Sequence, residues 1–154
     1  MAQKPIVIGC DDAAIGLKNA IKDLLDEQGV PYEDVGVEAE GDSTVYPSVA
    51  AKVAQMIIDS NFAKDGILIC GTGIGMSITA NKFPGIYAAL CHDAYSAERA
   101  RLSNNANVLC MGARVIGPEL AKKVVREWLQ LEFKEGRSSA KLQVIRELEK
   151  RLLK

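Results

Sequence analysis

Short apolar runs alternate along the chain with longer segments in which apolar and polar residues recur at helical spacing. Runs bounded by glycine, proline or charged residues indicate buried strands, and we expect them at residues 5–10, 32–37, 66–70, 86–91 and 107–111. The amphipathic segments between them predict helices at residues 15–28, 46–61, 76–82, 94–102 and 118–133. Strands that alternate with helices in this way predict an α/β fold with a parallel sheet covered on both faces.

The last segment, residues 139–154, departs from this alternation because no strand follows it. We expect a strongly charged helix here, with one narrow apolar stripe formed by Leu142, Ile145, Leu148 and Leu152. Such a stripe fits either ordinary packing within the chain or packing on a second subunit.

Composition narrows the class of protein. At 154 residues and 48% hydrophobic, the sequence suits one domain over residues 1–154, and a net charge of −1 argues against nucleic acid or an anionic membrane as main partner. No apolar stretch approaches a membrane span and no signal peptide is evident, so we expect a cytoplasmic protein. Four cysteines without Cys-x-x-Cys spacing and a single histidine make a poor zinc set, which predicts reduced thiols and no metal.

The junction between the apolar run 66–70 and the glycines that follow carries the clearest functional signal. Three glycines within residues 71–75 allow a sharp turn that points backbone amides outward, and the predicted helix adds its free N–H groups. Cys70, the last strand residue, lies beside this cradle for an anion, where a thiolate is favoured. The loop is neither a Walker A motif nor Gly-x-Gly-x-x-Gly, since Met76 stands at the third glycine. A glycine turn around a buried cysteine is the structural alternative.

Three loops are expected to meet beyond the carboxyl ends of the strands, where open parallel sheets bind ligands. They bring together Asp11 with Asp12, Cys70 with its glycine loop, and His92 with Asp93. Carboxylates, a thiol and amides in one crevice suit proton transfer on a small anionic substrate. Structural roles are the alternative, because aspartates cap helices and a neighbour such as Asp93 can hold His92.

Short motifs follow one another over nearly the whole chain: CGTGIG at 70–75, ANKFPG at 80–85, YSA at 95–97, NNANV at 104–108, GARVIG at 112–117 and GR at 136–137. Together they resemble the ribose-5-phosphate isomerase B family, which includes galactose-6-phosphate isomerase subunits. The resemblance implies a Rossmann-like α/β/α sandwich with an extra C-terminal helix for dimerisation, a homodimer or dimer of dimers, and no cofactor. It also implies aldose–ketose isomerisation of a phosphorylated sugar through a cis-enediolate.

The resemblance also implies roles for particular residues. Cys70 is the implied base that moves a proton between C1 and C2, and Asp11 the implied group for the hydroxyl protons. The implied oxyanion ligands are Thr72 and the amides of Gly71, Gly73, Ile74 and Gly75. The other implied substrate contacts are Asp12, Tyr46, Ser103, Asn104, Arg114, Arg137 and Lys141, with the last three at phosphate. Guanidinium groups suit phosphate, and a thiolate suits a carbon-bound proton.

Three positions depart from the family pattern, which has Asp-His at 11–12, His-Asn at 103–104 and arginine at 141. The histidine that opens the sugar ring in the family is Ser103 here. A tetrose 4-phosphate cannot close a five- or six-membered ring, because phosphate occupies its distant hydroxyl. Ser103 therefore favours a tetrose phosphate as substrate. The sequence of residues 95–106 favours it too, because it resembles the branch of the family that acts on erythrulose 4-phosphate. Ribose 5-phosphate is the second choice.

Ser103 and Asn104 precede the strand at 107–111, so we expect them at the amino edge of the sheet. The glycine loop lies at the other edge, roughly 17–20 Å away. We therefore expect a partner subunit to supply Asn104 to a shared site.

Two other functions stay open from the sequence. A phosphate- or nucleotide-binding module without catalysis would use the same loop, with Asp93 on a ribose hydroxyl. An inactive subunit of a hetero-oligomeric isomerase is the other, although the retained Cys70 and Thr72 argue against it.

Overall fold

The computed structural model describes residues 3–153, and a five-stranded sheet in the order β2-β1-β3-β5-β4 runs through its centre. All neighbouring strands are parallel. The strands are β1 (Ile6–Cys10), β2 (Tyr32–Asp34), β3 (Asp65–Cys70), β4 (Ala88–Leu90) and β5 (Val108–Gly112). The central strands β1, β3 and β5 are buried along their whole length, as expected where helices cover both faces. The predicted α/β fold is confirmed.

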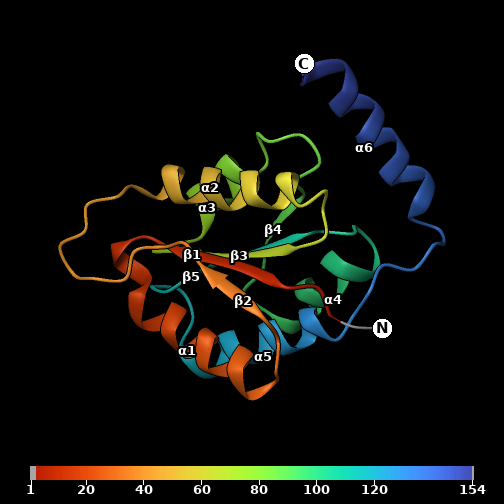
Figure 1. The fold of residues 1–154 in the computed structure, drawn as a ribbon. Coiled ribbons are helices and arrows are strands. Elements are labelled where there is room, and N and C mark those ends of the chain that lie inside the picture. The colour runs from red at the N-terminus through yellow and green to blue at the C-terminus, as the bar shows by residue number, and fades with distance from the viewer. Residues whose placement is uncertain (1–2, 154) are drawn as a thin grey trace.

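Helices cover the two faces of this sheet as separate layers (Figure 1). One layer holds α2 (Tyr46–Asp59) and α3 (Ile74–Ala80), and the other holds α1 (Ile15–Glu27), α4 (Ala94–Leu102) and α5 (Pro118–Leu129). A short 3-10 turn, Asp12–Ala14, precedes α1. Each face has its own buried cluster, with Trp128 the largest fully buried side chain on the α1 side.

The predicted C-terminal helix is present as α6 (Ser139–Leu152), which projects from the side of the molecule where the amino ends of the strands lie (Figure 1). Leu142 is its buried residue, whereas Leu148 and Leu152 are exposed. Within residues 3–153, no helix is long and apolar enough to cross a membrane.

Two predicted helices have other boundaries in the structure, for identifiable reasons. The helix expected at 76–82 begins at Ile74, because Gly73 takes a left-handed conformation (φ 76°) directly before it. It ends at Ala80, since the Asn81 side-chain amide instead pairs with the backbone of Ala88 at 3.0 and 2.8 Å. The helix expected to reach residue 133 ends at Leu129, beyond which half-buried and exposed residues alternate as in extended chain.

The two edge strands are shorter than predicted. The regular part of β2 ends at Asp34, although the N–H groups of Val35 and Val37 still bond to carbonyl groups of β1. At the start of the predicted strand 86–91, the chain forms a turn instead, with the Ile86 N–H donating to the Phe83 carbonyl at 3.1 Å. One edge strand thus loses its regular form towards its carboxyl end, and the other begins only after a turn.

Candidate active site

The glycine loop, residues 71–73, leaves the end of β3 and crosses the end of β5 with almost no space between the two backbones. A Cβ atom on Gly112 would lie 2.6 Å from the Thr72 Cα, and one on Gly73 would lie 2.7 Å from the Met111 carbonyl carbon. Real Cβ atoms do not come this close to backbone, so both positions require glycine. The motif residue Gly112 was not assigned a role from the sequence, and only the fold shows why glycine stands there.

Cys70 lies under this crossing, at the end of β3, and its side chain is buried. The Gly73 N–H donates to the Cys70 Sγ at 3.1 Å. A backbone donor at this position stabilises negative charge on sulfur. The other three thiols have no such donor, and burial raises the pKa of Cys10 and of Cys91 to about 11 and that of Cys110 further. They are neutral core thiols, as the sequence indicated.

Hydrogen-bond donors that face solvent come from the loop residue Thr72 and from the first turn of α3. Thr72 is exposed, and its Oγ1 accepts from the Ile74 N–H at 3.3 Å, which leaves its hydroxyl proton to point outward. Gly75 lies in the first turn of α3, where N–H groups have no acceptor within the helix. Tyr46, the first residue of α2, packs directly on Gly75, where a Cβ atom would lie 2.8 Å from the tyrosine Oη.

Arg114 and Asp11 border the same loop. The turn after β5 continues the pairing with β3, since the Arg114 N–H donates to the Gly71 carbonyl at 3.0 Å. Its guanidinium lies so close to Gly71 that a Cβ there would be 3.1 Å from the Arg114 Nη1. Asp11 follows β1 and accepts from the Ala13 N–H at 3.1 Å, the capping role given as its alternative. Burial raises the Asp11 pKa, and the Ala13 N–H and the Arg114 charge oppose this in part.

Asp12 and His92 follow strands at the same edge of the sheet, but His92 has a structural role and Asp12 is exposed. Asp12 is exposed in the short turn before α1. His92 has a structural partner, but the expected one was wrong: its Nε2 accepts from the Gly112 N–H at 2.9 Å. Asp93 instead caps α4 through the Ser96 N–H at 2.7 Å. His92 thus holds the strand end over which the glycine loop crosses.

Four predicted site residues lie at the opposite edge of the sheet, away from Cys70. Ser103 ends α4 and Asn104 follows it, exposed. Arg137 lies in the turn before α6 and Lys141 in its first turn, and both are exposed. The 6 residues of β3 that separate the two edges span roughly 17–20 Å. The predicted site residues therefore fall into two groups at opposite edges of the sheet, with Asn104 at the amino edge as the sequence predicted, and these groups are called the first half-site (at the glycine loop) and the second half-site (at Asn104).

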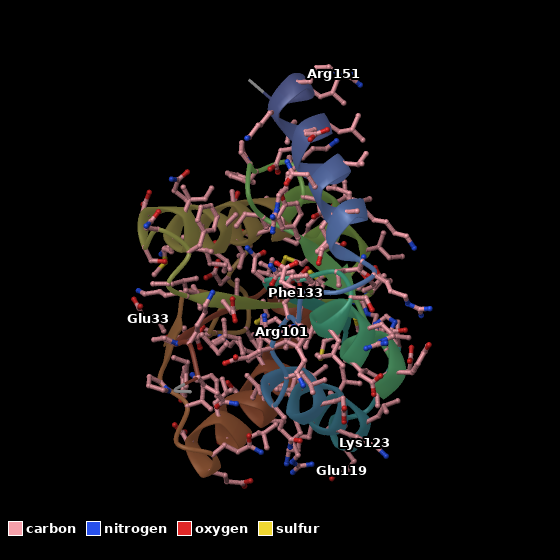
Figure 2. All side chains as sticks on the ribbon, turned by 90° about the vertical axis from the view of Figure 1, so that its right-hand side faces the viewer. Glu33, Arg101, Glu119, Lys123, Phe133 and Arg151 are labelled. Atoms are coloured by element: carbon pink, nitrogen blue, oxygen red, sulfur yellow. The ribbon has the colours of Figure 1, made fainter. Side chains whose placement is uncertain are left out.

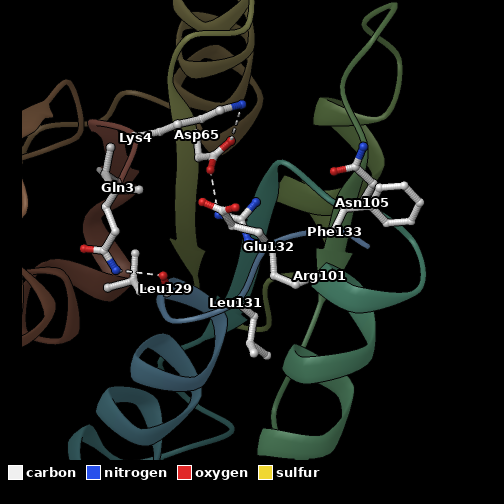
Figure 3. A pocket seen from close by; sticks show the side chains of 10 residues that line it. Gln3, Lys4, Asp65, Arg101, Asn105, Leu129, Leu131, Glu132 and Phe133 are labelled. Atoms are coloured by element: carbon white, nitrogen blue, oxygen red, sulfur yellow. Dashed lines mark hydrogen bonds and ion pairs between the residues drawn. The ribbon is translucent and has the colours of Figure 1, made fainter. Parts of the chain in front are cut away.

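The loop that carries Asn104 is fixed to the sheet through Arg101 (Figure 3). The Arg101 guanidinium stacks on Trp128 at 3.6 Å and donates to Asp65 Oδ2 at 2.6 Å and to the Ala106 carbonyl at 2.8 Å. A cavity of about 250 Å³ lies beside this ion pair. Arg101 and Phe133 both line this cavity, and Figure 2 shows them close together below α6.

A buried lysine that the sequence analysis missed supports the first half-site. Lys18 on α1 has no exposed surface and donates to Asp34 at 3.0 Å and to the Val37 carbonyl at 2.7 Å. Burial opposes the charge on Asp34, but hydrogen bonds from Lys18 and Lys22 hold its pKa below the usual value. The network fixes the chain after β2 against Cys10, next to Asp11. Its signal was a lysine three residues before Ile21, on the apolar face of the helix.

Residues 3–153 contain no cluster of three or more histidine, cysteine or acidic side chains able to hold a metal ion. The groups gathered at the glycine loop are instead a thiol, backbone amides, a hydroxyl, a carboxylate and a guanidinium. Such a set can move a proton on a small anion and stabilise an oxyanion without further groups.

Comparison with known proteins places this geometry in a family. Residues 6–145 match the family model described as Ribose/Galactose Isomerase. The chain is 53% identical over 140 residues to D-erythrulose-4-phosphate isomerase of Pectobacterium atrosepticum, covering 91% of each chain. It is 47% identical to ribose-5-P isomerase B of Listeria innocua, covering 95% of this chain and 97% of the relative.

A solved structure agrees with these relatives. Ribose-5-phosphate isomerase B from Clostridium thermocellum superposes with a TM-score of 0.89 at 41% identity, covering 96% of this chain and 98% of that chain. Fold, motifs and extent of the match coincide, and the chain belongs to the ribose/galactose isomerase family.

Proposed function

We propose that this isomerase interconverts the aldose and ketose forms of a tetrose phosphate, of the erythrulose 4-phosphate and erythrose 4-phosphate type, with Cys70 as the base. The observation that carries the proposal is the Cys70 Sγ held at 3.1 Å from the Gly73 N–H, at the start of a loop rich in outward donors. The match to isomerases along nearly the whole chain favours catalysis over a module that only binds phosphate or nucleotide.

The chemistry follows from the position of each group. The Cys70 thiolate removes a proton from C1 of the ketose, and the electron pair moves into a C1–C2 double bond as the carbonyl becomes an oxyanion. The Thr72 hydroxyl and the amides of Gly71 and Gly75 donate to that oxyanion, whereas the Gly73 and Ile74 amides, which the sequence also suggested, already donate to Cys70 Sγ and Thr72 Oγ1. Asp11 moves the hydroxyl proton between the two oxygens, and its raised pKa suits a group that must both take and return a proton. The Cys70 thiol then returns its proton to C2, which yields the aldose.

The phosphate ligands belong to both half-sites in this proposal. Arg114 lies at the glycine loop, whereas Arg137 and Lys141 lie at the far edge with Asn104. A homodimer, alone or within a dimer of dimers, would bring the far edge of one copy to the loop of the other. Val144, at 54% exposed, and Leu152, at 70%, give α6 an apolar surface suited to such a contact.

Substrate length is proposed from Ser103. A serine at the end of α4 offers no imidazole to open a sugar ring, and a tetrose 4-phosphate has no such ring to open. The relative from Pectobacterium atrosepticum is named for erythrulose 4-phosphate, in agreement with this choice. Ribose 5-phosphate is the second candidate because the relative from Listeria innocua is named for a ribose phosphate.

Replacing Cys70 by alanine tests the proposed base. We expect Cys70→Ala to lose isomerisation by roughly 10²–10⁴-fold or more, because the substitution removes the proposed general base. The assay is turnover of erythrulose 4-phosphate by purified protein, with circular dichroism to show that the variant is folded. A folded variant that keeps most of its kcat would exclude Cys70 as the base.

A panel of phosphosugars tests the proposed substrate. We expect a higher kcat/KM for erythrulose 4-phosphate than for ribose 5-phosphate, and we expect Ser103→His to narrow that difference by supplying an acid for ring opening. Preference of the wild type for ribose 5-phosphate would refute the argument from the acyclic substrate, while the isomerase assignment would stand.

Mixing two inactive variants tests the shared site. In a two-fold dimer, Cys70→Ala and Asn104→Asp place both lesions in one site and leave the other intact. Random reassembly at equal amounts gives about half heterodimers, so roughly a quarter of wild-type activity should return. Subunit exchange verified by mass spectrometry, without recovery of activity, would show that each site is built from one chain.

A further inference from the structure

The C-terminal helix α6 contacts the rest of the chain near its start, through Leu142, and again through Arg146 and Glu149, which both approach Tyr87. Leu142, near its start, is the buried apolar contact. Glu149, two turns further on, accepts from the Gly85 N–H through Oε1 at 2.8 Å and from the Tyr87 hydroxyl through Oε2 at 2.9 Å. A helix held at one point can rotate about that point, whereas contacts at two positions along it fix its orientation relative to the sheet.

The segment that receives Glu149 is itself held rigidly. Gly85 packs against Phe62, where a Cβ would lie 2.7 Å from the ring atom Cε1, and it has a left-handed φ of 80°. Asn107 donates from Nδ2 to the Gly85 carbonyl at 2.9 Å and accepts at Oδ1 from the Tyr87 N–H at 2.8 Å. Burial, reinforced by Glu149, raises the pKa of Tyr87 to about 12, so its hydroxyl remains a donor.

These bonds connect the loop after α4 with α6, the two elements that carry the second half-site. Asn107 belongs to the same loop as Asn104, and Glu149 belongs to the same helix as Lys141. Arg137 stands one turn before Lys141, and Lys141 shares a helix face with the exposed Ile145 and Leu148. Hydrogen bonds from Asn107 to residues 85–87, and from these residues to Glu149, thus join this loop to α6, with Arg146 beside Tyr87.

We infer that Glu149 is a positioning residue for phosphate binding: it fixes α6 to the Asn104 loop, so that Arg137, Lys141 and Asn104 are presented as one unit to the glycine loop of a second copy. This inference rests on the proposed function, because it takes the two cations as phosphate ligands. Glu149 does not touch substrate, and it acts through the direction of the helix.

The test compares variants of Glu149 with a matched control on the same helix. Glu149→Ala removes both bonds, whereas Glu149→Gln can still accept from the Gly85 N–H and donate to the Tyr87 oxygen. Glu147→Ala removes an equal charge from an exposed residue whose partner is Gln143, at 3.3 Å. Two quantities are measured on folded protein at a concentration where it is fully assembled: KM with kcat for the phosphosugar, and the affinity for inorganic phosphate by calorimetry.

We expect Glu149→Ala to raise KM and weaken phosphate affinity by roughly tenfold each, the scale of one charge-assisted contact, with kcat within about twofold. Glu149→Gln should restore most of both, and Glu147→Ala should match the wild type. A folded Glu149→Ala protein with unchanged KM and phosphate affinity would overturn the inference, as would equal losses in Glu147→Ala.

If the wild type isomerises no phosphosugar, the proposed function fails, and phosphate affinity alone then decides the role of Glu149. Wild type that isomerises the phosphosugar but has no affinity for inorganic phosphate would overturn the inference about Glu149 and leave the proposed function standing.

Discussion

The close crossing of the glycine loop over the end of β5 is the contact on which the rest of the first half-site depends. Thr72 passes Gly112, and Gly73 passes Met111, at distances that exclude any side chain on either glycine. A larger residue at 112 would push the loop away and carry the Gly73 N–H out of reach of the Cys70 sulfur. His92 holds the Gly112 N–H, and the turn that follows brings Arg114 onto Gly71. The thiol, the donors and one cation are thus placed by a single packing constraint.

The length of the central strands sets a second constraint. A buried parallel strand needs enough residues to cross the core, and this puts its two ends roughly 17–20 Å apart. Side chains at opposite ends of β3 cannot meet one small substrate. Under the proposed function, groups at the two edges can therefore meet one substrate only where two copies assemble, and α6 carries exposed apolar surface beside Lys141 that suits such a contact.

The sequence predicted those features that local patterns determine. Alternating strands and helices gave the parallel sheet, and the run of glycines after Cys70 located the loop. The predictions that were wrong concern properties set by contacts between segments that lie far apart in the sequence. The start of α3 depends on the conformation of Gly73, and the partner of His92 depends on where β5 ends beside β4. The buried Lys18 was overlooked because its partner, Asp34, lies on another element and its charge suggests exposure. The roles of the site residues in catalysis stay predictions.

The central claim is that Cys70 carries the proton between carbon atoms, and the most direct measurement is hydrogen exchange at those atoms. Erythrulose 4-phosphate is incubated with enzyme in D2O, and deuterium entering at C1 is followed by proton NMR. A thiol base exchanges its proton with solvent while the enediolate exists, so wild type should place deuterium at C1 and Cys70→Ala should not. Deuterium incorporation by a folded Cys70→Ala protein at the wild-type rate would contradict the account.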